Sequence, residues 1–406
     1  MRKSLFGYAN TTKSIAKSGG WCIYDDKFDK ISSDEWGNVL LPSSEFKAQL
    51  SGLEIPSPGF APTHELIKKA QNLISEYDYF YLSGMPKSIW ISGTNGKTTT
   101  TKMTQFLLES KGAQMGGNVG IALADLAKSA PLWILETSSF TIHYTKHAKP
   151  DIYALLPITP DHLSWHGSMS EYEKAKLKPL KMMSEQAAAI IPAAFKTHEF
   201  VKNSKAKIYF YENERDLAET LGIEFYKIQF KVPFLMDAIF ALALQKLILG
   251  FCDYEFLNRF VIENNKLEEL CDNKNRLWVN DTKATNIDAC IKAIERYADD
   301  EIFIILGGDD KGVDLSPVFE ALANLTKKPK IYAIGSNTDK IVEFSKKFKL
   351  EFYACYELKT AVKKIDEMLG NSGCVALLSP ACASLDQFSS YAQRGEVFKE
   401  EIAKLK

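Results

Sequence analysis

Short apolar runs alternate with helix-like segments along most of this chain, and this alternation limits the folds that it can adopt. Helical patterns occupy residues 102–111, 288–297 and 360–369, among others. Seven apolar runs could form buried strands, namely residues 88–92, 132–135, 152–156, 276–279, 302–306, 331–334 and 375–378. Strand–helix alternation with short connections is typical of α/β proteins with largely parallel sheets. We therefore predict an α/β protein whose sheets are flanked by helices.

The length of 406 residues suggests two or three domains. Residues 56–62 contain three prolines and a glycine and can form only a loop. Gly84 and Pro86 follow before the first clear strand, and the polar stretch 263–275 precedes a later one. Boundaries at these points give three predicted domains, which are residues 1–87, 88–262 and 263–406.

The overall composition excludes several classes of protein. Fifty basic residues against 51 acidic ones leave no general excess of positive charge for nucleic acid or an anionic membrane. The seven cysteines form no C-x-x-C pair, which favours free thiols in a reducing cytosol. The most apolar stretch, residues 234–251, is interrupted by Asp237, Gln245 and Lys246 and is too short to span a bilayer. We expect a cytoplasmic protein that binds neither nucleic acid nor membrane.

Residues 93–100 read Gly-Thr-Asn-Gly-Lys-Thr-Thr-Thr and lie between a predicted strand and a predicted helix. This is the context of a phosphate-binding loop, although the general pattern has a glycine where Ile91 stands. Lys97 would contact the terminal phosphates and the Thr98 hydroxyl would bind magnesium. A glycine turn with a helix-capping threonine is the alternative. The predicted ATP-binding residues here are Gly93, Thr94, Asn95, Gly96, Lys97, Thr98 and Thr99.

Glu136 directly follows the apolar run 132–135. A carboxylate at the carboxyl end of a strand beside a phosphate loop is well placed to bind magnesium, directly or through water. Strand ends are often acidic for no such reason, so this assignment depends on the loop.

Several motifs together identify a family. Residues 93–99, Glu-Thr-Ser-Ser-Phe at 136–140, and Asp161-His162 followed by Tyr-Glu-Lys-Ala-Lys at 172–176 resemble the Mur ligase family, and more loosely the folylpolyglutamate synthetases.

Residues 280–286, 307–312 and 379–388 resemble the branch that adds D-glutamate. Another amino-acid-adding ligase and a nucleotide-driven switch are the alternatives.

The resemblance implies three domains: one for a UDP-sugar, a central P-loop ATPase-like domain for ATP, and a dinucleotide-fold-like domain for the amino acid. The implied reaction uses ATP to join D-glutamate to UDP-N-acetylmuramoyl-L-alanine through an acyl phosphate, in cytoplasmic peptidoglycan synthesis. We expect a monomer.

The resemblance also implies that Lys97, His162 and Lys176 are catalytic. Thr98 and Glu136 would bind one magnesium ion, and His162 and Lys176 a second. Lys176 would be carbamylated by carbon dioxide, which requires an amine whose pKa is lowered by burial or nearby cations. From residue type alone, Lys176 could be a solvated helix lysine and His162 a structural histidine.

Further binding residues follow from the same resemblance. For ATP they are Lys266, where the family has arginine, Asp281 and Lys283. For the UDP-sugar substrate they are Asn118, Ser138, Thr11, Lys27, Ser57 and Gly59, and for D-glutamate Thr285, Lys311, Ser384, Leu385 and Tyr391. Asn118 could instead be a left-handed turn residue, Thr285 a helix cap and Ser384 a turn residue. The positions expected to contact adenine hold Phe234, Leu235 and Ala238.

Overall fold

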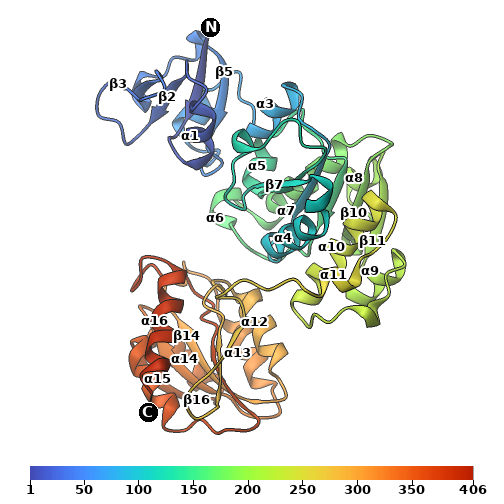
Figure 1. Ribbon diagram of the computed structural model, residues 1–406. Coiled ribbons are helices and arrows are strands. Elements are labelled where there is room, and N and C mark those ends of the chain that lie inside the picture. The colour runs from blue at the N-terminus through green and yellow to red at the C-terminus, as the bar shows by residue number, and fades with distance from the viewer. Residues whose placement is uncertain (406) are drawn as a thin grey trace. The chain divides into compact units, whose positions relative to one another are not determined.

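The computed structural model describes residues 1–405 and contains three largely parallel sheets flanked by helices (Figure 1). Backbone contacts divide the chain into two compact units, Met1–Phe260 and Val261–Lys406. The first unit contains two sheets and the second contains one. The predicted α/β class is therefore confirmed.

The first sheet has the strand order β3-β4-β2-β1-β5, and only the β3–β4 pair is antiparallel. Its strands are β1 (Arg2–Phe6), β2 (Cys22–Asp25), β3 (Ser32–Ser33), β4 (Val39–Pro42) and β5 (Ser51–Pro56). The accompanying helices are α1 (Asn10–Ala16), α2 (Glu65–Lys69) and α3 (Glu76–Leu82). Because β1, β2 and β5 are parallel, their carboxyl ends meet at one edge of the sheet.

The central sheet is parallel throughout, with the order β11-β10-β9-β6-β8-β7. Its strands are β6 (Ser88–Ser92), β7 (Gln114–Gly117), β8 (Trp133–Glu136), β9 (Ile152–Leu155), β10 (Ala188–Pro192) and β11 (Lys207–Tyr211). After β6 the chain moves to one side of the sheet, and after β9 it moves to the other. Such a reversal opens a crevice at the carboxyl ends of the two strands, where α/β proteins bind ligands.

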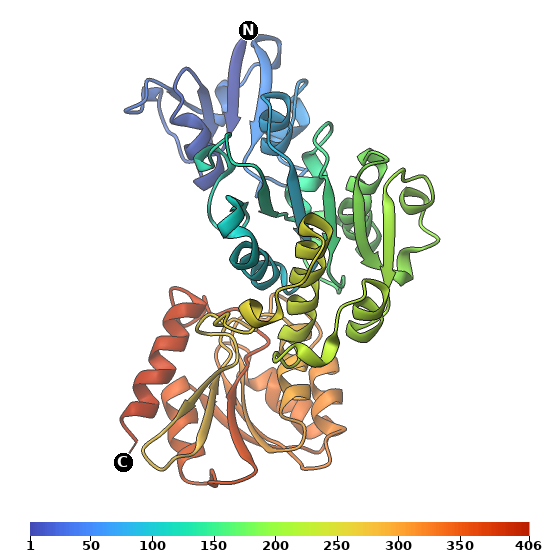
Figure 2. The ribbon, with the colours of Figure 1, turned by 45° about the vertical axis from the view of Figure 1, so that its right-hand side comes forward.

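The helices of this part cover both faces of the central sheet (Figure 2). They are α4 (Lys97–Leu108), α5 (Ser139–Tyr144), α6 (Leu163–His166), α7 (Met169–Met182), α8 (Glu199–Lys202), α9 (Glu214–Thr220), α10 (Phe234–Leu249) and α11 (Tyr254–Leu257). Helix α10 is apolar on almost every side and packs against α4. A helix of this kind is stable only inside a protein, which explains why it lies in the core.

The third sheet, in the second unit, has the order β12-β13-β17-β14-β15-β16, with only β12 antiparallel to its neighbour. Its strands are β12 (Glu268–Cys271), β13 (Leu277–Asn280), β14 (Glu301–Gly307), β15 (Lys330–Ile334), β16 (Glu351–Tyr356) and β17 (Cys374–Leu378). Its helices are α12 (Ile287–Arg296), α13 (Ser316–Ala323), α14 (Thr338–Lys347), α15 (Leu358–Asp366) and α16 (Tyr391–Ala403). Helices α15 and α16 share one apolar core with the sheet.

All seven predicted strands are confirmed, each within one residue at either end. Helix α4 begins at Lys97, five residues before the predicted start at residue 102, because Gly96 serves as its N-cap. The polar stretch 263–275, predicted only as a boundary, contains the edge strand β12. None of the helices formed within residues 1–405 combines the length and apolar character needed to cross a membrane.

Glu76 is a buried carboxyl group where α3 meets the segment that follows β7. Glu76 is only 5% exposed, and its Oε1 accepts a hydrogen bond from the Leu123 amide at 3.1 Å. Burial, with a smaller contribution from the charge of Asp125, raises the pKa of Glu76 to about 8. The carboxyl group is therefore protonated in the folded protein at neutral pH.

This raised pKa predicts a pH-dependent stability. Unfolding releases the Glu76 proton once the pH exceeds the unfolded pKa of 4.5. The free energy of unfolding should then fall by about 1.4 kcal/mol per pH unit until the folded pKa is reached. Glu76→Gln removes this pH dependence. In urea denaturation, the free energy of unfolding of the variant, relative to that of the wild type, should therefore rise by about 3 kcal/mol between pH 5.5 and pH 8. Glu65→Gln, at an exposed site, is the control. If the free energy of unfolding depended on pH in the same way in the wild type and in Glu76→Gln, the prediction would be contradicted.

Candidate functional site

The loop between β6 and α4 contains two glycines that no other residue type could replace without strain. Gly93 has a φ of 141° and Gly96 a φ of 82°. A Cβ atom on Gly93 would lie 2.5 Å from Cβ of Leu156, and one on Gly96 would lie 2.5 Å from Oδ1 of Asp237. Gly96 is the N-cap of α4 and no side chain caps the helix, so the alternative of a threonine cap is wrong. An uncapped helix N-terminus attracts anions such as phosphate.

Thr94 fixes this loop to the neighbouring connection after β9. Its hydroxyl donates to the carbonyl oxygen of Thr159 at 3.0 Å and accepts from the Thr159 amide at 2.9 Å. The Tyr172 hydroxyl lies 3.1 Å away and must donate, because the only hydroxyl proton of Thr94 is already used. The Thr94 amide also donates to the carbonyl of Pro157 at 3.1 Å. The protein's own contacts therefore hold the loop in shape.

Two lysines converge on one carbonyl oxygen of the loop. Lys97 Nζ donates to the oxygens of Gly93 and Thr94 at 3.0 and 2.7 Å. Lys176 Nζ, from α7, donates to the same Gly93 oxygen at 2.8 Å. Lys176 is 1% exposed, so its interpretation as a solvated helix lysine is wrong.

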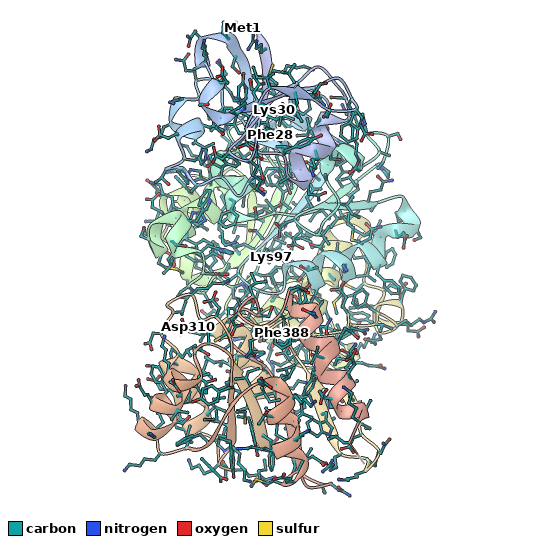
Figure 3. All side chains as sticks on the ribbon, turned by 90° about the vertical axis from the view of Figure 1, so that its left-hand side faces the viewer. Met1, Phe28, Lys30, Lys97, Asp310 and Phe388 are labelled. Carbon is teal, nitrogen blue, oxygen red and sulfur yellow. The ribbon has the colours of Figure 1, made fainter. Side chains whose placement is uncertain are left out.

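The electrostatics of the two amines differ. Burial lowers the pKa of Lys97, while the charges of Glu136 and Asp161 oppose that shift. Burial and then the charge of Lys97 lower the pKa of Lys176 well below its usual value. Figure 3 shows Lys97 within the first unit. Lys176 is therefore the amine that more readily loses its proton.

Glu136 ends β8 and is 2% exposed. Its Oε1 accepts from the side-chain amide of Asn118 at 2.7 Å, whereas Oε2 is buried and has no hydrogen-bond partner. A buried carboxylate oxygen without a partner is unfavourable alone and suits a hard cation. Asn118 has no positive φ, so its interpretation as a left-handed turn residue is wrong.

Residues 1–405 do not form a complete metal cage of their own. In the part of the chain that the structure describes, no three His, Cys, Asp or Glu side chains gather where they could hold a metal ion. Magnesium keeps several waters and binds phosphate oxygens together with one or two carboxylates. Glu136, at the end of β8, and Thr98, in the first turn of α4, are residue types that fit this partial donor set.

Two histidines lie beside the loop. His162 has a φ of 53° and a side chain that is 47% exposed, with Nε2 3.4 Å from Oδ2 of Asp161. It is therefore not a buried structural histidine. His166, which the sequence analysis missed, is a partly buried neighbour whose Nε2 lies 2.9 Å from the Ser139 hydroxyl. Burial lowers the pKa of His166 to about 4, so it is neutral at pH 7. Its spacing of four residues from His162 was the available signal.

Asp237 is a second residue that the sequence analysis did not assign. It is 4% exposed, and its Oδ1 accepts from the Thr100 hydroxyl at 2.7 Å. It is the only acidic residue of α10, and an acid inside an apolar helix was a signal of a specific role. The predicted adenine positions Phe234 and Ala238 are buried and apolar.

The residues predicted for the UDP-sugar lie on two parts of the first unit. Thr11, Lys27, Ser57 and Gly59 follow the carboxyl ends of β1, β2 and β5. Asn10 Nδ2 donates to the Gly120 carbonyl at 3.2 Å, so α1 contacts the turn that begins at Asn118.

Ser138, the other predicted residue, caps α5, since its hydroxyl accepts from the Thr141 amide at 3.1 Å. Phe28 and Lys30, near Lys27, are labelled in Figure 3.

In the second unit, Asp281 is 7% exposed and follows β13. Its Oδ2 accepts from the Ser379 hydroxyl at 2.7 Å, and burial raises its pKa to about 7. Lys266 Nζ lies 3.2 Å from a carboxylate oxygen of Glu263, and Lys283 Nζ lies 5.6 Å from the ring centre of Tyr391.

The residues predicted for D-glutamate lie on loops at the carboxyl edge of the third sheet. Figure 3 shows Asp310 and Phe388, from two of these loops, at the same end of the sheet. Thr285 is not a helix cap, because Asn286 is the N-cap of α12. Of the other predicted residues, Lys311 and Leu385 are exposed and Tyr391 is partly exposed. Ser384 begins a turn, because its carbonyl oxygen accepts from the Phe388 amide at 2.8 Å.

The chain is similar to known proteins over its full length. The family model of the Mur ligase middle domain matches residues 91–237. A UDP-N-acetylmuramoylalanine–D-glutamate ligase of Campylobacter jejuni subsp. jejuni serotype O:23/36 (strain 81-176) is 56% identical over 410 residues, covering 100% of both chains. One from Helicobacter pylori (strain ATCC 700392 / 26695) is 43% identical over 424 residues, again covering 100% of both.

Solved structures share the fold. A MurF ligase from Thermotoga maritima in complex with ADP has a TM-score of 0.58 and 16% identity, covering 87% of this chain and 88% of that one. MurF from Acinetobacter baumannii has a TM-score of 0.59 and 15% identity, covering 99% and 91%.

The packing of the loop glycine against Asp237 can be tested with a matched pair of variants. Gly96 and Gly250 both have a φ of 82°, but a Cβ on Gly250 would meet nothing within 4 Å. Gly250→Ala should lower the free energy of unfolding by about 1 kcal/mol through backbone strain alone. Gly96→Ala should lower it clearly further, because its Cβ also collides with Asp237. Chemical denaturation measures both values, and an equal loss of unfolding free energy in Gly96→Ala and Gly250→Ala would contradict this prediction.

Proposed function

Because the chain belongs to the Mur ligase family, and within it to the UDP-N-acetylmuramoylalanine–D-glutamate ligases, we propose that it uses ATP to join D-glutamate to UDP-N-acetylmuramoyl-L-alanine. The observation that carries the proposal is the cluster at the carboxyl edge of the central sheet. There, the partly buried Lys97 and the buried Lys176 share one loop carbonyl beside a glutamate with an unpartnered oxygen. This arrangement suits the transfer of a phosphoryl group to a carboxylate.

The chemistry explains why such a cluster is needed. A carboxylate is a poor electrophile because oxide is a very poor leaving group. Transfer of the γ-phosphoryl group of ATP gives an acyl phosphate and ADP, and the amine of D-glutamate then displaces phosphate through a tetrahedral intermediate. The first step brings a carboxylate against a polyanion, so the protein must supply positive charge and alignment. Lys97 is assigned to the β- and γ-phosphates, with residues 93–99 around them.

Magnesium completes this charge balance in the proposal, with Thr98 and Glu136 at one ion and His162 and Lys176 at a second. When bound, the ion would neutralise developing charge on the phosphate oxygens. The unpartnered Oε2 of Glu136 supports the first assignment. His162, whose side chain is 47% exposed, is the residue assigned to the second.

Carbamylation of Lys176 would supply the missing anionic ligand. The neutral amine attacks carbon dioxide, a C–N bond forms, and one proton is released to give a carbamate anion. The lowered pKa of Lys176 supports this step, because only the unprotonated amine is nucleophilic. An ammonium group, in contrast, cannot bind a cation.

The remaining assignments distribute the substrates over three domains, taken as residues 1–87, 88–262 and 263–406. Thr11, Lys27, Ser57, Gly59, Asn118 and Ser138 are assigned to the UDP-sugar substrate. Lys266, Asp281 and Lys283 are assigned to ATP, and Thr285, Lys311, Ser384, Leu385 and Tyr391 to D-glutamate. We place the enzyme, as a monomer, in cytoplasmic peptidoglycan synthesis.

The direct test incubates the purified chain with UDP-N-acetylmuramoyl-L-alanine, ATP, Mg²⁺ and either enantiomer of glutamate. Phosphate release and a nucleotide product heavier by one glutamyl residue are expected with D-glutamate and not with L-glutamate. Phosphate release without any acceptor would instead indicate a nucleotide-driven switch. Turnover only with another amino acid would overturn the assigned substrate.

The carbamate assignment has its own test. Lys176→Ala should lower kcat by about 100-fold or more, because an anionic ligand is lost, and acetate or formate should restore part of the activity. Lys174→Ala is the matched control, since Lys174 lies on the same helix with a side chain that is 51% exposed. After equilibration with ¹³C-bicarbonate, wild type and Lys174→Ala should show a protein carbamate carbon signal and Lys176→Ala should not. The signal persisting in Lys176→Ala would exclude this site.

A further inference from the structure

Arg394 is a buried cation in the second unit, and no carboxylate within residues 1–405 forms an ion pair with it. Arg394 is 1% exposed and lies in the first turns of α16. Nε donates to the Thr282 hydroxyl at 2.9 Å, and Nη2 donates to the carbonyl oxygens of Thr282 and Cys382 at 2.9 and 3.2 Å. Nη1 donates more weakly to the Ala383 carbonyl at 3.4 Å. All four acceptors are neutral.

The second buried arginine of the same unit shows how such a group is usually balanced. Arg276 has a side chain that is 3% exposed, and it forms ion pairs with the carboxylates of Asp272 and Asp366. It directly precedes β13, at the amino edge of the parallel strands. Arg276 therefore has two anions and Arg394 has none, although both are buried to a similar degree.

An unpaired buried charge is costly, and proteins retain one where another group compensates it or where function uses it. Burial lowers the pKa of Arg394 only to about 10, so it remains charged at neutral pH. The nearest acid that acts on it, Asp386, does so through space and uses Oδ2 to accept from the Ser336 amide at 2.8 Å. Asp386 thus offsets the positive charge of Arg394 only through space, without an ion pair.

The contacts of Arg394 join the loops that carry the proposed D-glutamate residues. Thr282 lies on the loop that contains Thr285, and Ala383 directly precedes Ser384. A Cβ on Gly308, three residues before Lys311, would lie 3.3 Å from Nη1 of Arg394 and 2.1 Å from the Ala383 carbonyl oxygen. One guanidinium therefore joins the loops that follow β13 and β17, and it lies beside the loop that follows β14.

We propose that Arg394 is a positioning residue for the anionic amino acid: it holds the loops after β13 and β17 in register, and its charge, which no ion pair within residues 1–405 balances, favours a dicarboxylate over neutral amino acids. This inference rests on the proposed function. It names no contact between Arg394 and the substrate, since four of the five N–H groups of Arg394 donate to protein acceptors. The amino end of the 13-residue helix α16 adds positive potential at the same edge.

The test measures steady-state kinetics of the full chain for Arg394→Lys and Arg394→Met, with Arg276→Lys as the control for disturbing a buried arginine. We expect Arg394→Met to raise the KM for D-glutamate about 30-fold while the KM for ATP changes less than about twofold. Arg394→Lys keeps the charge but loses the fork that joins the loops, so its KM for D-glutamate should rise less, about fivefold. Arg276→Lys should leave both KM values unchanged.

A second measurement distinguishes the loss of electrostatic attraction for the substrate from general damage to the protein. The preference for D-glutamate over D-glutamine, measured as a ratio of kcat/KM values, should fall in Arg394→Met and be retained in Arg394→Lys. Should Arg394→Met fail to fold, Arg394→Lys alone decides: a fivefold rise confined to D-glutamate supports the inference. An unchanged KM for D-glutamate, or equal rises in the KM of every substrate, would overturn it. Absence of ligation by the wild type would instead reject the proposed function.

Discussion

The amines of Lys97 and Lys176 both lie within 3.0 Å of the Gly93 carbonyl oxygen, and the rest of the site depends on this close approach. The charge of Lys97 disfavours a charge on Lys176, because like charges repel strongly where water is excluded. Each of the acids Glu136 and Asp161 favours the charged form of both lysines, but Lys176 is also opposed by Lys97. The proposed function assigns Lys97 to phosphate as a cation and Lys176 to carbon dioxide as a nucleophile.

The parallel sheet is what allows residues distant in sequence to meet at this loop. Carboxyl ends of neighbouring parallel strands lie at one edge, so the connections after β6, β8 and β9 bring Gly93, Glu136 and Thr159 to the same region. This much could be predicted from the sequence, because apolar runs identify the strands and polar residues follow their ends. The phosphate loop was equally accessible, since its glycines precede a helix-forming segment.

Other parts of the site could not be read from local patterns. Asp237 contacts Thr100 across 137 positions of sequence, and its role appears only when α10 packs against α4. Arg394 contacts Thr282 across 112 positions, and nothing in its neighbourhood distinguishes it from a surface arginine. The burial of Lys176 likewise depends on how α7 packs on the sheet, which is why residue type alone favoured a solvated lysine.

The central claim is that the loop directs the γ-phosphoryl group onto the substrate carboxylate. Its most direct test uses UDP-N-acetylmuramoyl-L-alanine labelled with ¹⁸O in the alanyl carboxyl group, with ATP and D-glutamate present. If an acyl phosphate forms, each inorganic phosphate released should carry one ¹⁸O atom from the substrate. Unlabelled phosphate, formed while the amide product accumulates, would contradict the claim.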